Sequence, residues 1–240
     1  MKPDGQRTLA IDVGGTGLKA SVLDDQGKMT MEQVRVETPP APCPPKVIVK
    51  ALLELVKPLP AYDRVSVGFP GYIRDNKVIT APHFADERWH GFELARELQT
   101  KLGKPVRMLN DADMQGLAAI KGKGLELVVT LGTGFGSAMF FNGELLPHME
   151  LAHHPIRKRK DYDAFLGNLE LKRIGKKRWN ERVREVIEIL HRVFQYDTLY
   201  IGGGNARKIS LKLDSNIEIV SNQNGILGGF LLWKKMDEKG

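Results

Sequence analysis

The chain has 240 residues, a formal net charge of +7 at pH 7 and a single cysteine, Cys43. This length can bury one large core or two smaller ones, and no apolar run approaches the ~20 residues of a membrane span. One cysteine excludes an intrachain disulfide and a cysteine-based zinc cluster, so we expect a cytoplasmic protein without structural zinc. The polar segment Met1 to Arg7 predicts no signal peptide. The positive charge fits a polyanionic partner, or solubility alone.

The first quarter of the chain predicts three strands followed by a helix. Thr8 to Asp12 is an apolar, β-branched run that ends in a glycine turn, and Leu18–Leu23 and Met29–Val36 continue as strands. After a proline-rich link, Lys46–Lys57 carries apolar residues at helical spacing. Arg64–Val67 is then predicted as a buried strand.

The remaining expected elements alternate between helices and strands. In chain order they are a helix at 92–102, a strand at 105–109, a helix at 112–120, strands at 125–131 and 137–141, helices at 161–172 and 180–194, strands at 198–201 and 217–220, and a last helix at 225–235. The order strand, glycine turn, strand and helix at 8–57 thus recurs at 125–194. This repetition indicates two similar α/β lobes, and the pattern alone predicts an α/β fold with mixed sheets.

Three glycine turns follow predicted strands, at Gly14–Gly17, Gly132–Gly134 and Gly202–Gly204. Without a Cβ in the way, backbone N–H groups at such turns can approach phosphate oxygens closely. Each turn could also be a plain hairpin or loop turn. Three turns in one chain, with Asp111 at the end of a further strand, favour phosphate binding with a carboxylate beside it.

Asp111 is the candidate general base. A sugar hydroxyl is a poor nucleophile, and a carboxylate within hydrogen-bonding reach can take its proton as a phosphoryl group arrives. The alternative for Asp111 is a helix N-cap, which aspartate fills well between a strand and a helix. Asp113 is the rival carboxylate, and we expect it to stabilise the start of the helix.

Several motifs together resemble the ROK family of sugar kinases, and within it the polyphosphate glucokinase branch. The resemblance runs from about Leu9 to about Gly229, and it rests on the order and spacing of the three turns, Asn110-Asp111, and Glu150-Leu151-Ala152-His153. It implies a two-lobed, actin-like (ribonuclease H-like) α/β fold with a cleft between the lobes. The expected domains are a small lobe at 1–110, a large lobe at 111–224, and a C-terminal helix at 225–240 that packs back on the small lobe.

The resemblance also assigns roles to individual residues. The expected sugar-binding residues are Asn110, Asp111, Glu150, His153, Gly71 and His83. The expected donor-binding residues are Gly14, Gly15, Thr16, Gly17, Lys19, Gly132, Thr133, Gly134, Gly203 and Gly204. Asp12 is expected to hold Mg²⁺ through water, since Mg²⁺ keeps much of its hydration. Lys19 could instead be a solvated strand residue, and His153 a structural histidine.

Two positions depart from the family pattern. Ala152 stands where the family has glycine, and His83 stands where it usually has a sugar-contacting asparagine. Both affect the expected sugar site, so they put the choice of sugar in question. The basic run Arg157–Lys160, with further cations to Arg178, is either a solvated face or a path for a polyanion.

The function that follows is transfer of a phosphoryl group from polyphosphate, ATP or both to the 6-hydroxyl of glucose or a close hexose. A homodimer is expected, because ROK kinases are often dimers, and neither DNA nor a membrane is an expected partner. The alternatives are a non-catalytic sugar or polyanion binder of the same fold and a strictly ATP-dependent sugar kinase. A transcriptional regulator would carry an N-terminal helix-turn-helix domain, and only about seven residues precede the first strand.

Overall fold

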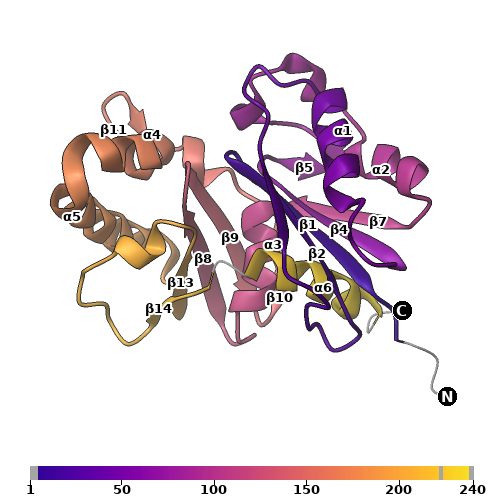
Figure 1. The fold of residues 1–240 in the computed structure, drawn as a ribbon. Coiled ribbons are helices and arrows are strands. Elements are labelled where there is room, and N and C mark those ends of the chain that lie inside the picture. Colours follow the sequence, from indigo (N-terminus) through magenta and orange to yellow (C-terminus); the bar gives the residue numbers. More distant parts are fainter. Residues whose placement is uncertain (1–4, 222–223, 238–240) are drawn as a thin grey trace. The chain divides into compact units, whose positions relative to one another are not determined.

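The computed structural model describes residues 5–221 and 224–237, and the chain divides into two compact units (Figure 1). The first unit runs to Ala118 and resumes at Gly225, and the second holds Ala119–Asn224. The boundary predicted from the sequence lies between residues 110 and 111, just before helix α3 (Asp111–Ala119). In the structure, residues 111–118 of that helix group with the first unit. Among the described residues, no helix combines the length and the apolar content needed to cross a membrane.

A five-stranded mixed sheet forms the centre of the first unit. Its strands are β1 (Thr8–Val13), β2 (Gly17–Leu23), β3 (Val34–Glu37), β4 (Arg64–Phe69) and β7 (Val106–Asn110). The order across the sheet is β3-β2-β1-β4-β7, antiparallel among the first three strands and parallel from β1 to β7. The strand expected at 29–36 is wrong in its first half, because Met29 makes only an isolated bridge to Leu23 and regular pairing begins at Val34.

Two helices and a group of aromatic rings supply the core beside this sheet. Helix α1 (Pro45–Val56) and helix α2 (Leu94–Leu102) bury their apolar residues in one cluster with the strands. The rings of Phe69, Phe84 and Trp89 contact one another, with centroids 5.0–5.6 Å apart. Phe84 and Trp89 come from two single turns, which follow two short strands in the chain. These elements are β5 (Ile73–Arg74), β6 (Lys77–Val78), η1 (Pro82–Phe84) and η2 (Glu87–Trp89).

Helix α6 (Asn224–Asp237) completes the first unit although it is far from that unit in sequence. Its Trp233 indole donates to the Val65 carbonyl at 3.3 Å, and the guanidinium of Arg107 lies 3.8 Å from the centroid of the Trp233 ring. A Cβ added to Gly228 would lie 1.8 Å from the Met114 carbonyl oxygen, so only glycine allows α6 to approach α3 this closely.

The second unit repeats the same sheet plan. Its strands are β8 (Leu125–Leu131), β9 (Phe135–Phe141), β10 (Glu144–Leu145), β13 (Thr198–Gly202) and β14 (Ile217–Ile219). The order β10-β9-β8-β13-β14 has an antiparallel side and a parallel side, as in the first unit. Each sheet therefore begins with two antiparallel strands joined by a glycine turn, which confirms the duplication seen in the sequence.

The long helix of the second unit is interrupted at one glycine. Helix α5 (Asn168–Phe194) is interrupted at Gly175, whose φ of 79° and ψ of 161° are not helical. The two helices expected at 161–172 and 180–194 therefore become α4 (Tyr162–Leu166) and the two segments of α5. The remaining pieces are short. They are η3 (Leu151–His153), β11 (Pro155–Arg157), β12 (Lys160–Asp161) and η4 (Ala206–Lys208).

Candidate active site

The first glycine turn joins β1 to β2 and is held by its own backbone. The N–H of Gly14 donates to the carbonyl of Gly17 at 3.1 Å. The Thr38 hydroxyl donates to the Gly14 carbonyl at 2.6 Å, so the segment after β3 fixes the turn from the side. Thr16 is exposed at the tip. The remaining N–H groups of such a turn and this hydroxyl are suitable donors to a phosphate.

His83 lies against this turn. A Cβ added to Gly15 would be 3.2 Å from Cγ of the His83 imidazole, so the ring packs on the glycine backbone. The half-buried ring comes from η1, a single turn that buries Phe84 in the aromatic group. The structure therefore brings His83, expected at the sugar site, next to residues expected to bind the phosphoryl donor.

Asp12 and Lys19 form an ion pair beside the first turn. They are direct partners in the antiparallel β1–β2 register, and Nζ of Lys19 donates to Oδ2 of Asp12 at 2.9 Å. The two side chains keep 13% (Asp12) and 28% (Lys19) of their surface exposed. The Lys19 ammonium is thus not a freely solvated group, and its position beside the turn depends on Asp12.

Asn110 and Asp111 stand where β7 ends and α3 begins. Oδ1 of Asn110 accepts from the N–H of Ala112 at 2.7 Å and of Asp113 at 3.3 Å, which is the geometry of a helix N-cap. Nδ2 of Asn110 donates to the Gly71 carbonyl at 3.1 Å. Asn110 therefore fills the capping role that the sequence left open for Asp111. Asp111 is the first residue of the helix, and its Oδ1 also accepts from the N–H of Ala112 at 2.9 Å.

Gly71 needs to be glycine for a steric reason. A Cβ there would lie 2.0 Å from the Thr80 carbonyl oxygen. The resulting close approach lets the Asn110 amide bond to the Gly71 carbonyl. Gly71, Asn110 and Asp111 are consequently held in one rigid arrangement. Asp113, the rival carboxylate, is almost fully buried at 3% exposure.

Asp12 and Asp111 are both placed near the same edge of the first sheet. Asp12 lies one residue before the carboxyl end of β1, and Asp111 directly follows β7; these parallel strands lie on either side of β4. Two strand spacings place their backbones about 10 Å apart. Ligands in open α/β sheets bind at this edge. Gly68 lies between them on β4, and a Cβ on it would be 3.6 Å from the Asp111 Cα.

The second glycine turn, between β8 and β9, is tied to the turn after β13. The Asn205 amide donates to the Gly132 carbonyl at 3.0 Å, and the N–H of Asn205 donates to the Leu131 carbonyl at 2.8 Å. Gly203 has a φ of 86°, and a Cβ on it would lie 2.4 Å from the Leu131 carbonyl oxygen. The structure thus joins the two turns, with Gly204 exposed beside Gly203.

Asp163 covers one side of the second turn. Its Oδ1 accepts from the N–H of Phe135 at 2.5 Å, and a Cβ on Gly134 would lie at the same distance from that oxygen. One N–H of this turn is therefore already satisfied by a carboxylate. The N–H of Gly132 donates to the Gly134 carbonyl at 2.9 Å.

Glu150 belongs to a row of titratable side chains in the second unit. Its Oε1 lies 3.5 Å from Nε2 of His148, and its Oε2 lies 4.0 Å from Nε2 of His153. Nδ1 of His153 is in turn 3.8 Å from Oδ2 of Asp161. Oε1 of Glu150 is buried and makes no hydrogen bond. A buried carboxylate oxygen without a donor is costly, so it marks a place where a ligand hydroxyl can donate.

Sequence reasoning missed four residues that shape these sites, namely Thr38, His148, Asp163 and Asn205. Asn205 directly follows the third glycine turn, and His148 lies two residues before Glu150, so a search of the motif flanks could have found both. Thr38 and Asp163 form hydrogen bonds with residues 24 and 28 positions away in the chain, so no local sequence pattern indicates these bonds.

Comparison with known proteins identifies the family. The model of the ROK family matches residues 8–154. The chain belongs to the ROK family. The polyphosphate glucokinase of Mycobacterium tuberculosis (strain ATCC 25618 / H37Rv) is 30% identical over 228 residues, which cover 91% of this ROK protein and 84% of that relative.

Solved structures agree with the family and the fold. The inorganic polyphosphate/ATP-glucomannokinase from Arthrobacter sp. strain KM has a TM-score of 0.86 at 30% identity, and the match covers 97% of this chain and 100% of that chain. A ROK family glucokinase from Streptomyces griseus, in complex with glucose and AMPPNP, has a TM-score of 0.73 at 19% identity, with 92% and 97% covered. The ROK protein described here has the two-lobed, actin-like α/β fold.

Proposed function

We propose that this protein is a hexose kinase that transfers a phosphoryl group from polyphosphate, and also from ATP, to the 6-hydroxyl of glucose or a close hexose. The names of the relatives at 30% identity support both the reaction class and the donors. A non-catalytic sugar or polyanion binder is not favoured, because the relatives that cover most of the chain are kinases.

The observation that carries the proposal is the position of Asp111. It lies at the carboxyl edge of the first sheet, where Asn110 supplies the N-cap of α3 and Oδ1 of Asp111 also accepts from the N–H of Ala112 at 2.9 Å. In the proposed reaction this carboxylate takes the proton of the 6-hydroxyl. The hydroxyl oxygen then bonds to the terminal phosphorus of the donor, and the bond from that phosphorus to its bridging oxygen breaks.

The glycine turns would hold the donor phosphates in this scheme. The exposed Thr16 hydroxyl and the N–H groups of the first turn are available on the first unit, and Gly132–Gly134 with Gly203 and Gly204 are proposed as the donor turn of the second. Lys19 would contribute positive charge there, steadied by Asp12. These contacts would stabilise the charge that develops on the transferred group.

Glu150 and His153 are proposed to bind the hexose. The buried Oε1 of Glu150 is ready to accept from a sugar hydroxyl, and His148 and His153 flank the same carboxylate. Asn110 and Gly71 would act by holding Asp111 in place. Ala152 is buried next to this pair, and His83 packs on the first turn. These two residues are the positions from which the choice among hexoses would be altered.

The residues also fit Mg²⁺ delivered with the donor. The described residues hold no group of three or more His, Cys, Asp or Glu side chains placed to bind a metal. Mg²⁺ in kinases is commonly held by one or two carboxylates together with substrate phosphates and water. The half-buried Asp12 carboxylate, at the edge of the sheet beside the first turn, is suited to bind it through water. When bound, Mg²⁺ would neutralise donor charge. We also propose a cytoplasmic homodimer, as in the sequence-based expectation.

The experiment that tests the base is Asp111→Asn with Asp113→Asn as its matched control. Both changes remove one carboxylate from the first turn of α3. We expect Asp111→Asn to lower kcat by about 10²–10⁴-fold with little change in thermal unfolding, because an amide cannot accept the proton. The readout is formation of hexose 6-phosphate with polyphosphate and with ATP, over a panel of hexoses.

Three results would contradict the proposal. Asp111 is not the base if the variant keeps more than about a tenth of the wild-type rate. Asp113 takes its place if Asp113→Asn alone abolishes turnover in a folded protein. If the wild-type protein binds hexoses and forms no hexose 6-phosphate from either donor, it is a binder and not a kinase.

A further inference from the structure

Many cations of the second unit are held by carboxylates. Arg157 pairs with Glu185 at 2.7 Å, and Lys160 donates to the buried Glu170. Arg173, Lys160 and Arg182 all bond to Glu170 and hold the pKa of its carboxyl well below the usual range, against the opposing effect of burial. Half of the basic run at 157–160 therefore has a structural role, which leaves only Lys158 and Arg159 free for a ligand on that hairpin.

A second group of cations gathers where α5 passes the segment after β13. The Asn180 amide donates to the carbonyls of Lys176 at 2.9 Å and of Lys208 at 3.2 Å. Oδ1 of Asn180 accepts from the N–H of Ser210 at 2.7 Å. One buried side chain thus holds two basic segments together. Lys177 lies three residues before Asn180 and so lies on the same face of the helix.

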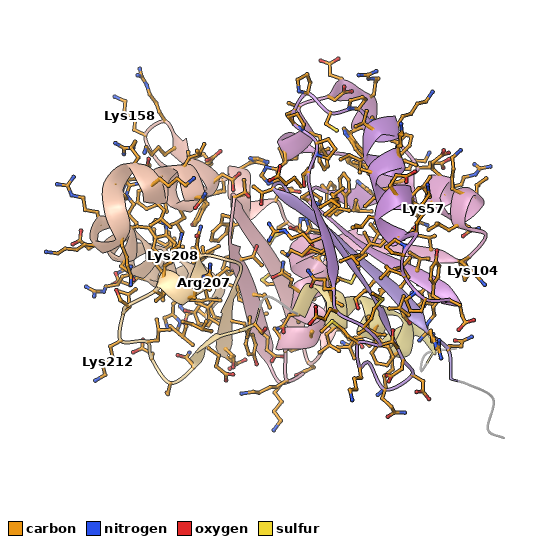
Figure 2. All side chains as sticks on the ribbon, in the orientation of Figure 1. Lys57, Lys104, Lys158, Arg207, Lys208 and Lys212 are labelled. Carbon is orange, nitrogen blue, oxygen red and sulfur yellow. The ribbon has the colours of Figure 1, made fainter. Side chains whose placement is uncertain are left out.

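We call this group the cationic surface. It consists of Lys176, Lys177, Arg207, Lys208 and Lys212. Figure 2 shows its last three members along one stretch of the second unit, and Lys158 on a separate hairpin. Within the described part of the chain, none of the five side chains pairs with a carboxylate. The two segments, 175–180 and 203–214, hold six Lys and Arg residues in all and one acidic residue, Asp214.

The cationic surface is continuous with the proposed donor turn. Nζ of Lys208 donates to Oδ1 of Asn205 at 2.8 Å, and Nδ2 of the same Asn205 donates to the Gly132 carbonyl at 3.0 Å. One side chain therefore separates the Lys208 ammonium from the turn. Positive charge begins beside the turn and extends outward through Arg207, Lys177 and Lys212, all of which are exposed.

We propose that the cationic surface binds the part of a polyphosphate chain that lies beyond the phosphoryl group being transferred. The inference rests on the proposed function, since it needs a donor phosphate at the Gly132–Gly134 turn. A polyphosphate chain carries negative charge along its whole length, so it gains from a row of unpaired cations and releases counterions on binding. ATP ends in a nucleoside, and its few charges are shared with Mg²⁺, so it gains little from the outer cations.

The test is the triple variant Lys177→Gln, Arg207→Gln and Lys212→Gln. It removes three exposed cations without a carboxylate partner and keeps Lys208 beside the turn. The matched control replaces three exposed lysines of the first unit, Lys28, Lys46 and Lys50, by Gln, so the net charge falls equally. Steady-state kinetics are measured with long-chain polyphosphate, tripolyphosphate and ATP.

We expect the triple variant to raise the KM for long-chain polyphosphate about tenfold at low salt, and to flatten the dependence of that KM on salt. The KM values for tripolyphosphate and ATP, and every kcat, should stay near wild type in the triple variant and in the control. An unchanged KM for the long chain overturns the inference. So does an equal rise for long and short donors, or an equal rise in the control.

Direct binding separates this inference from the proposed function. Titration calorimetry with long-chain polyphosphate and no hexose measures the cationic surface without turnover. Binding by wild type that the triple variant loses supports the surface, even if polyphosphate proves not to be a phosphoryl donor. No binding by wild type overturns it, while phosphorylation of hexose from ATP would leave the proposed hexose kinase standing.

Discussion

Replacing Asn110 by alanine would show whether this side chain holds the catalytic edge or touches the sugar. The change removes the cap of α3 and the bond to the Gly71 carbonyl. A lost N-cap costs about 1 kcal/mol, and a lost hydrogen bond to a buried carbonyl costs about 1 kcal/mol more. The sum of about 2 kcal/mol lowers the melting temperature of a chain of this size by about 4–8 °C.

The control is Asn110→Ser. A serine hydroxyl caps a helix nearly as well as asparagine, but it is too short to reach Gly71, so about half of the loss should remain. Thermal unfolding followed by circular dichroism measures both variants, and hexose titration of the rate measures KM and kcat. We expect kcat to fall in Asn110→Ala, because the freed helix end carries Asp111.

A different result would refute this reasoning. If Asn110→Ala melts within about 1 °C of wild type and raises the KM for hexose about tenfold or more, the side chain is a sugar ligand and not a structural cap. Stability and sugar affinity thus separate the sequence-based role of Asn110 from the role that its hydrogen bonds indicate.

Further predictions concern the second unit. Glu150→Gln should raise the KM for hexose about tenfold or more, because a charge-assisted hydrogen bond is lost, and His153→Ala should raise it less; unchanged values in both would move the hexose elsewhere. Gly203→Ala should destabilise the folded protein by about 3 kcal/mol or more. The control Gly175→Ala should cost about 1 kcal/mol, because a Cβ there meets nothing within 4 Å at a similar φ. Equal melting temperatures of the two variants would exclude the steric argument. Glu170→Gln should cost about 2–3 kcal/mol at neutral pH, measured by urea unfolding. The pKa of Glu170 is lowered in the folded protein. Its stabilisation is therefore present above the unfolded pKa of about 4.3 and is lost as the pH falls below that value. A stability difference between wild type and Glu170→Gln that grows below pH 4 would contradict this prediction.

The sheets were predictable from the sequence because their signals are local. Apolar runs such as Thr8–Val13 and Leu125–Leu131 end in glycine turns, and the repeated order of strand, turn and strand predicts the repeated sheet. Edge pairing was harder to predict. Residues after Met29 look apolar enough for a strand, yet Met31 is 37% exposed, and the ladder starts only at Val34.

The site residues were predictable as types, while their roles depended on contacts. Asn and Asp are equally good helix caps, so the sequence cannot tell which of Asn110 and Asp111 caps α3; the hydrogen bonds of Asn110 decide it. The basic run at 157–160 gave no sign that Lys160 would bond to Glu170, ten residues on. The cationic surface was also hidden, because it combines segments about thirty residues apart through Asn180.

The placement of α6 sets the order in which the two units can fold during synthesis on the ribosome. The second unit is one continuous stretch of sequence, whereas the first unit needs residues from both sides of it. Nascent chains generally fold from the N-terminus onward. In this protein the first sheet is synthesised before α6, so the surface covered by Ile226, Phe230 and Trp233 stays exposed until the second unit has been synthesised. The first unit is therefore synthesised first but completed last, and its exposed sheet is where a chaperone would be needed.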